Sequence, residues 1–242
     1  MLREVATRYG RTPGGYLWAV IEPLGTLLIV SAAFSLLLRN PSLGDSFILF
    51  YAAAFLPFNV FSGIAHVTMQ AIAFSRPLLR FPTVGWIDAL MARFILNALT
   101  LLLVSYVLVL GILWATGTRT LIDLPPVLAA FGLSLLLGFG VGAFNCAVQG
   151  LFPIYGTLWG IVTRPLMLAS AILFIVEDLP KFAQTILWFN PLVHITGLSR
   201  AGFYPVYAPT YLSQVYVLLC ALVPMALGLL LLRRHHLAIL NR

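Results

Sequence analysis

Charged residues are scarce in this chain of 242 residues, where Asp, Glu, Lys and Arg together make up only 9%. A soluble domain is about a quarter charged, and the 14 basic and 7 acidic side chains here could not cover a water-soluble protein of this length. Hydrophobic residues make up 61% of the chain, and its mean hydropathy is +1.02. Uncharged stretches run far beyond the roughly 18 residues that a membrane-spanning helix needs. The sequence therefore predicts an all-α integral membrane protein and excludes a β-barrel, whose strands alternate polar and apolar residues.

The motifs of several enzyme classes are also absent. The sequence has no G-x-x-x-x-G-K-[ST] loop, so the chain cannot itself be a P-loop ATPase. It has no H-E-x-x-H, C-x-x-C or G-x-S-x-G pattern. Its two cysteines, Cys146 and Cys220, lie in apolar runs typical of small buried hydrophobic residues. We therefore expect no catalytic residue, no metal site and no cofactor in this chain.

The apolar stretches predict six membrane spans within a single transmembrane domain of residues 1–242. The spans are expected at about 16–38, 46–75, 87–116, 126–149, 154–176 and 211–232. Residues 1–14 predict an interfacial helix, because Leu2, Val5, Ala6 and Tyr9 recur at helical spacing. The stretch 177–210 is too apolar for a solvated loop, so we expect short helices there that dip into the membrane surface. The span near 126–149 carries small residues at close-packing spacing, Gly138, Gly142 and Ala143.

The net charge of +7 is distributed unequally across this six-span arrangement. Six spans place both termini on one side, and that side carries eight basic residues outside the spans against four on the other. In a soluble chain such a charge would indicate nucleic-acid binding, but membrane proteins carry excess Lys and Arg on cytoplasmic loops. We therefore expect both termini in the cytoplasm, the 177–210 region outside, and no nucleic-acid partner.

A few polar side chains within or beside the spans are candidates to line a transport path. Arg164 lies about 15 Å of helical rise into the fifth span, the deepest cation of the chain. Aromatic residues precede it and could stack on sugar rings. The candidates are Arg164, Trp159, Tyr155, Phe152, Glu22 and Arg93. The simpler alternative is that the charges snorkel or pair near the membrane surface and that the aromatic side chains form interfacial belts.

Two stretches of the sequence carry a family resemblance. The first is Arg3-Glu4-Val5-Ala6-Thr7-Arg8-Tyr9-Gly10, followed by Gly15-Tyr16-Leu17-Trp18-Ala19-Val20-Ile21-Glu22-Pro23. The second is Phe189-Asn190-Pro191-Leu192-Val193-His194, followed by Ser199-Arg200. Both resemble the membrane subunit, or permease, of bacterial ABC exporters for capsular polysaccharide, in a wider group that includes O-antigen and teichoic-acid permeases. Two departures are Phe189, where the family often has Trp, and an N-terminal segment shorter than usual.

The resemblance implies a homodimer in the bacterial inner membrane, with two copies of a separate cytoplasmic ATPase subunit that binds ATP and Mg²⁺. It implies a lipid-linked, often anionic, polysaccharide as cargo, and export partners in the periplasm and outer membrane. Residues 1–13 and 76–86 would receive the ATPase, with Arg3, Arg8, Arg11, Arg76 and Arg80 as candidate contacts. The outer gate would contain Trp188, Asn190, Pro191, His194 and Arg200.

Three other functions remain open at the level of sequence. A permease of the same architecture could export O-antigen, teichoic acid or another cargo. An intramembrane enzyme acting on a lipid-linked sugar would need a catalytic acid or a metal pair, and the sequence shows neither. A passive channel would work without an ATPase.

Overall fold

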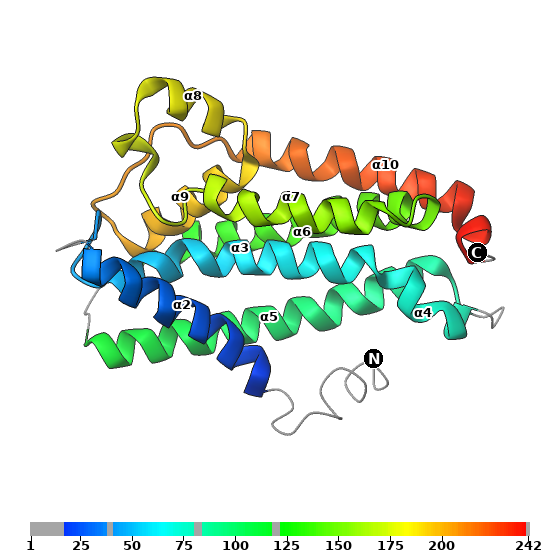
Figure 1. Ribbon diagram of the computed structural model, residues 1–242, viewed down its shortest axis with the longest axis horizontal. Coiled ribbons are helices and arrows are strands. Elements are labelled where there is room, and N and C mark those ends of the chain that lie inside the picture. The colour runs from blue at the N-terminus through cyan, green and yellow to red at the C-terminus, as the bar shows by residue number, and fades with distance from the viewer. Residues whose placement is uncertain (1–16, 38–40, 80–83, 118–121, 241–242) are drawn as a thin grey trace.

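The computed structural model describes residues 17–37, 41–79, 84–117 and 122–240, and every regular element in these ranges is a helix (Figure 1). The long helices are α2 (Leu17–Leu37), α3 (Phe47–Met69), α5 (Trp86–Thr116), α6 (Leu124–Leu151) and α10 (Gln214–Leu240). The shorter ones are α4 (Ala71–Leu79), α7 (Tyr155–Ala169), the 3₁₀ helix η1 (Val176–Asp178), α8 (Lys181–Trp188) and α9 (Pro191–Phe203). The predicted all-α fold is confirmed.

Local sequence signals mark several helix ends. Ser46 caps α3, and its hydroxyl accepts a hydrogen bond from the backbone N–H of Leu49 at 3.4 Å. α6 follows Asp123 and has proline in its first turn, where the missing N–H costs no helical hydrogen bond. α5 ends at Gly117, whose φ of +62° is a left-handed conformation that glycine adopts without strain.

Within the described residues, five helical segments are long and apolar enough to cross a membrane: Leu17–Leu36, Phe47–Leu79, Trp86–Thr116, Leu124–Leu151 and Gln214–Leu240. They coincide with five of the six predicted spans. In the fifth predicted region, 154–176, the helix α7 has only 15 residues, about 22 Å of rise, and ends at Ala169. Two residues in a turn follow, Ser170 and Ala171, and Ala171 has a φ of +53°. The second span also differs from expectation, because α3 ends at Met69 and a separate helix, α4, begins after Gln70.

α6 lies at the centre of the bundle and packs against α3, α9 and α10 (Figure 1). Glycine allows these helices to approach closely. A Cβ on Gly138 would lie 2.8 Å from the backbone oxygen of Phe61, and one on Gly142 would lie 2.9 Å from that of Ala65. Gly228 of α10 contacts the α6 backbone at Phe144 in the same way. The predicted close packing of small residues on this helix is confirmed.

The bundle has two distinct ends. At one end, called here the α4 end, the Trp86 ring at the start of α5 lies 6.1 Å from the His236 ring near the end of α10. The other end, called the α9 end, is covered by η1, α8 and α9 (Figure 1). α9 packs between α3 and α6, and the backbone N–H of Asp123 donates to the Gly202 oxygen at 2.9 Å. The expected helices within 177–210 are therefore present, and α9 is buried rather than solvated. The predicted interfacial helix, residues 1–14, lies outside the described residues.

Candidate functional site

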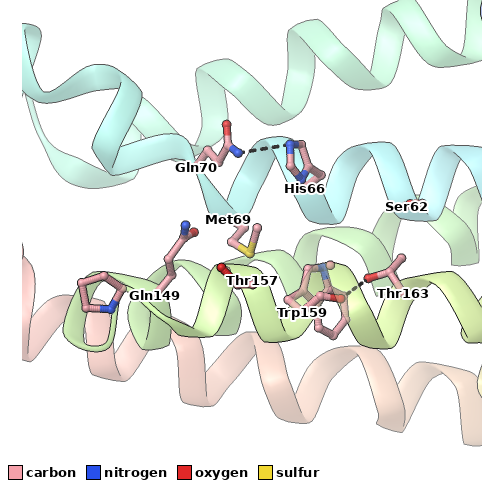
Figure 2. A pocket seen from close by; sticks show the side chains of 11 residues that line it. Ser62, His66, Met69, Gln70, Gln149, Thr157, Trp159 and Thr163 are labelled. Carbon is pink, nitrogen blue, oxygen red and sulfur yellow. Dashed lines mark hydrogen bonds between the residues drawn. The ribbon is translucent and has the colours of Figure 1, made fainter.

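A partly open cavity of about 380 Å³ lies between α3 and α7, toward the α4 end of the bundle (Figure 2). α7 has no buried residue and packs mainly on α6, which leaves the space beside α3 open. The cavity is lined by Ser62, His66, Met69, Gln70, Gln149, Pro153, Gly156, Thr157, Trp159, Gly160 and Thr163. We call it the inner cavity. Its lining combines hydroxyl, amide and imidazole groups with one indole ring and contains no carboxylate, lysine or arginine.

The last turn of α3 and its C-cap form one wall. His66 and Gln70 are four residues apart, so they lie on the same helical face, and their Nε2 atoms are 3.1 Å apart (Figure 2). Gln70 also interrupts the helix. Its backbone oxygen accepts a hydrogen bond from Nη1 of Arg93 on α5 at 3.2 Å, which fixes the junction between α3 and α4.

The turn from α6 to α7 supplies the opposite corner of the cavity. Gln149 stands in the last turn of α6, and its Oε1 atom is buried without a hydrogen-bond partner among the described residues. A Cβ on Gly156 would lie 2.7 Å from Nε2 of Gln149, so the glycine leaves room for this amide. A buried amide oxygen without a partner is costly, and the Gln149 side chain is also one of the residues that line the cavity.

α7 provides the third wall. Trp159 and Thr163 are four residues apart and both line the cavity, and the Thr163 hydroxyl donates to the Trp159 backbone oxygen at 2.6 Å (Figure 2). An indole ring beside hydroxyl and amide groups can hold a ligand that has both an apolar face and many hydroxyls. The inner cavity therefore combines hydrogen-bonding groups with an aromatic surface.

The predicted path residues are only partly brought together at this cavity. Trp159 lines it. The Tyr155 hydroxyl instead donates to Oδ1 of the buried Asn145 at 2.8 Å, which ties the start of α7 to α6. Phe152, at the end of α6, is 62% exposed and does not line the cavity.

The three predicted charged residues lie in different surroundings. Arg164 is exposed on α7, and the described part of the chain offers it no hydrogen bond or ion pair. It follows Gly160 by four residues, so it stands one turn beyond the cavity on the Gly160 side. Glu22 is exposed on α2. Arg93 is buried, and its guanidinium stacks 4.2 Å above the Phe74 ring, so it braces α4 rather than facing the cavity.

The predicted ATPase contacts fall largely outside the described residues, since Arg3, Arg8, Arg11 and Arg80 belong to the ranges not described. Arg76 is described. It lies on α4, and its Nη2 atom donates to the backbone oxygen of Ile239 near the end of α10 at 3.4 Å. This places Arg76 at the α4 end of the bundle.

The five predicted outer-gate residues do come together, around α9. Asn190 caps α9 by accepting from the Leu192 N–H at 3.0 Å, and it donates to the Ala169 oxygen at the end of α7 at 2.9 Å. Pro191 is the first residue of α9. Nδ1 of His194 accepts from the Ser213 N–H at 3.2 Å, so Nε2 carries the proton and donates to the Trp188 oxygen at 2.8 Å. Burial lowers the pKa of His194, which keeps this bridge neutral.

Arg200 is the most fully buried large side chain of this group, at 1% exposure. Nη1 donates to the backbone oxygens of Ala171 and Phe174, each at 2.7 Å, and Nη2 donates to that of Ile172 at 2.6 Å. The guanidinium also lies 4.2 Å above the Phe50 ring. Arg200 thus holds the turn that ends α7 against α9 and α3.

Sequence reasoning missed most of the inner cavity. The predicted site residues did not include Ser62, His66, Gln70, Gln149, Thr157 or Thr163. The available signal was the presence of amide, hydroxyl and imidazole groups inside strongly apolar helices, with His66 and Gln70 at helical spacing. Their convergence with Gln149 depends on how α3, α6 and α7 pack, and the spacing within any one helix does not reveal it.

The chain is similar to known proteins over nearly its whole length. The profile of the ABC-2 type transporter family matches residues 1–204. The polysialic acid transport protein KpsM of Escherichia coli is 32% identical over 99% of this chain and 93% of its own length. The capsule polysaccharide export inner-membrane protein CtrC of Neisseria meningitidis is 26% identical over 97% of this chain and 88% of its own length. The capsule polysaccharide export inner-membrane protein BexB of Haemophilus influenzae is 27% identical over 96% of this chain and 88% of its own length.

Proposed function

The chain belongs to the ABC-2 type transporter family, and on that basis we propose that it is the membrane-spanning subunit of an ATP-driven exporter of lipid-linked capsular polysaccharide. The observation that carries the proposal is the similarity over full length to KpsM, with 32% identity across 99% of this chain. The similarities to CtrC and BexB, two further capsule export proteins, extend over 96% or more of the chain. The same architecture exporting O-antigen, teichoic acid or another cargo is the alternative.

The inner cavity supports a sugar cargo. A polysaccharide presents hydroxyl groups around each ring and C–H groups on its faces, and the cavity offers amide and hydroxyl partners beside the Trp159 ring. Arg164 lies one turn farther along α7, where its guanidinium could receive a carboxylate or phosphate of the same cargo. An exposed arginine in the middle of an apolar bundle is costly against lipid, so we place Arg164 on a polar path.

The exposed face of α7 also supports a homodimer. α7 carries Thr157, Gly160 and Arg164 on an exposed side, and such a polar stripe suits an aqueous path or a protein partner better than hydrocarbon. α2 is likewise weakly packed, because only 11% of the residues in its apolar 18-residue stretch are buried. We infer that a second copy of the chain covers α2 and α7 and that the cargo passes between the two copies.

Energy for export would come from a separate ATPase, because this chain has no P-loop. Two cytoplasmic ATPase subunits, which bind ATP and Mg²⁺, would contact the dimer through residues 1–13 and 76–86. Arg76 at the α4 end is the described member of this set. This arrangement places both termini in the cytoplasm, the α9 end toward the periplasm and its export partners, and the protein in the bacterial inner membrane.

The proposal is tested by deleting the gene in its own bacterium and measuring surface and internal polysaccharide. We expect capsular polysaccharide to disappear from the surface, to accumulate inside with its lipid attached, and to return when the intact gene is supplied. Loss of O-antigen or teichoic acid instead would establish the alternative cargo.

Energy coupling needs a second measurement on the purified protein. We expect an ATPase subunit to co-purify with the chain, and transport into inverted vesicles to require ATP. Transport of the polysaccharide by the chain alone in ATP-free vesicles would contradict the proposal and favour a passive channel.

A further inference from the structure

A second cavity, of about 410 Å³, lies at the α9 end of the molecule, between η1, α8 and the segment that precedes α10. We call it the outer cavity. Its polar and aromatic lining comes from Glu177, Lys181, Gln184, Thr185, Trp188, Phe189, Thr210 and Tyr211. The volume lies within the roughly 300–1,000 Å³ of small-molecule binding sites. The resemblance assigns Trp188, at one side of this cavity, to an outer gate, but it assigns no ligand to the cavity.

Hydrogen bonds fix the aromatic side of the outer cavity. Nε1 of Trp188 donates to the backbone oxygen of Tyr211 at 3.2 Å, and the Trp188 ring stacks on Tyr216 with centroids 5.0 Å apart. The Tyr211 and Tyr207 hydroxyls are 3.3 Å apart, and Tyr207 donates to Glu177 at 3.0 Å. Burial raises the pKa of Tyr211 to about 12, so its hydroxyl stays neutral.

Several polar groups of this lining can form further hydrogen bonds. Nε2 of Gln184 donates to the backbone oxygens of Leu179 and Glu177, which orients the amide and leaves its Oε1 to accept. Among the residues that the structure describes, the Glu177 carboxylate accepts hydrogen bonds only from Tyr207, and an ionised carboxylate can accept about four. Lys181 lines the same cavity, and within the described residues it forms no ion pair with Glu177.

Arg200 positions the wall that carries Glu177. Its three hydrogen bonds to the oxygens of Ala171, Ile172 and Phe174 hold the segment that leads directly into η1. Glu177 is the central residue of η1. The outer cavity is therefore built on a fixed backbone, although Glu177 itself is exposed.

We propose that the outer cavity is a second binding site for a sugar unit of the exported polysaccharide. This inference rests on the proposed function. Opposite charges within one cavity do not select a strongly anionic or cationic ligand, but they supply an acceptor and a donor for sugar hydroxyls. The rings of Trp188 and Tyr211 supply the apolar surface that the C–H face of a pyranose requires.

A site at each end would let the polysaccharide be held at the α9 end while the inner cavity is emptied and refilled. The two cavities are lined by different helices, α3 and α7 for the inner one and η1 and α8 for the outer one. A strand engaged at both ends would be prevented from sliding back between transport steps.

The test is cross-linking in cells that are making capsule. The photoreactive residue p-benzoylphenylalanine is introduced in place of Thr185, which lines the outer cavity, or in place of Phe182 as a control. Phe182 lies on the same helix, is 78% exposed and does not line the cavity. A third position, Thr157, reports the inner cavity. We expect polysaccharide to cross-link at Thr185 and Thr157, with at least tenfold less at Phe182.

Two neighbouring acidic residues, Glu177 and Asp178, provide a test substitution and its control. Glu177→Gln removes the charged acceptor from the cavity, whereas Asp178→Asn changes an exposed acid that does not line it. We expect Glu177→Gln to lower cross-linking at Thr185 about tenfold, the factor that loss of one charged hydrogen bond gives. Asp178→Asn should leave it within twofold, and neither change should alter cross-linking at Thr157.

The possible outcomes separate the two proposals. Cross-linking at Thr157 but not at Thr185, in cells that export normally, would overturn the outer site and leave the proposed function standing. Equal cross-linking in the Glu177→Gln and Asp178→Asn proteins would also overturn it. Absence of cross-linking at all three positions during normal export would contradict the proposed path itself.

Discussion

At the scale of single residues, the two most informative side chains are arginines with opposite surroundings. Arg200 is buried, and its two terminal nitrogens donate hydrogen bonds to three backbone oxygens. Arg164 is exposed and has no such partner in the described chain. A cation that already has partners holds structure, whereas a cation without one is available to a ligand. The two positions therefore predict different consequences when they are replaced.

Under the proposed function, Arg164→Ala should lower polysaccharide export by tenfold or more, because it removes the cation that we propose binds acidic groups of the cargo. Arg164→Lys should be partly active, since it keeps the charge and loses the planar fork. Surface polysaccharide and the membrane abundance of the protein must be measured together. Normal export by the Ala variant at normal abundance would remove Arg164 from the transport path.

Arg200→Leu should lower the free energy of unfolding by about 3 kcal/mol, because it leaves three carbonyl oxygens without donors. Its melting temperature in detergent should fall clearly, while that of Arg234→Leu, which changes an exposed arginine on α10, should stay close to the wild type. Equal melting temperatures for the two variants would mean that the Arg200 hydrogen bonds do not stabilise the fold.

At the scale of helices, the sequence predicts the long spans well and their interruptions poorly. Runs of apolar residues locate five segments, since hydrophobicity over about 20 residues decides membrane insertion. The prediction for the last segment, 211–232, misses its C-terminal end, because α10 continues to Leu240. The junction at Gln70 and the end of α7 at Ala169 depend on distant partners. Arg93 holds the first from α5, and Arg200 holds the turn after the second from α9. Such partners are separated by tens of residues, so local patterns do not reveal them.

The close packing of α6 gives a prediction with a control on the same helix. Gly142→Ala should destabilise the protein by about 1–3 kcal/mol, because the new Cβ would lie 2.7 Å from the Thr68 Cβ and 2.9 Å from the Ala65 oxygen. Gly132 has nothing within 4 Å of its ideal Cβ position. Gly132→Ala should be neutral or stabilise the helix by up to about 1 kcal/mol. Thermal unfolding of the two purified variants compares them directly.

At the scale of the whole molecule, the fold class, the family and the short helices within residues 177–210 could be predicted from the sequence. The inner cavity could not, apart from Trp159, because His66, Gln70 and Gln149 meet only through packing. The six-span count stays a prediction, since α7 has 15 residues and about 22 Å of rise. A bilayer core is about 30 Å thick. Whether α7 and the turn that follows it cross the membrane therefore needs a direct test.

Reporter fusions test the orientation and the crossing together. Fusions at Arg242 and Lys181 should report opposite compartments, with Arg242 inside, as the excess of basic residues on that side predicts. A fusion after Phe152 should report the same compartment as Arg242, because α7 separates it from Lys181. If Phe152 and Lys181 report the same compartment, α7 does not cross the membrane and the chain has five spans.

The hydrogen bonds of Arg200 to three backbone oxygens have a consequence for how the structure responds to pH. The guanidinium is held by carbonyl dipoles and not by a carboxylate of the described chain, and carbonyls do not titrate. Burial lowers the pKa of Arg200 to about 10, which still keeps it charged in acidic, neutral and mildly alkaline media. An ion pair would weaken in acid as its carboxylate took up a proton. The contact that Arg200 makes between α7 and α9 therefore keeps its strength as the surroundings become more acidic or mildly alkaline.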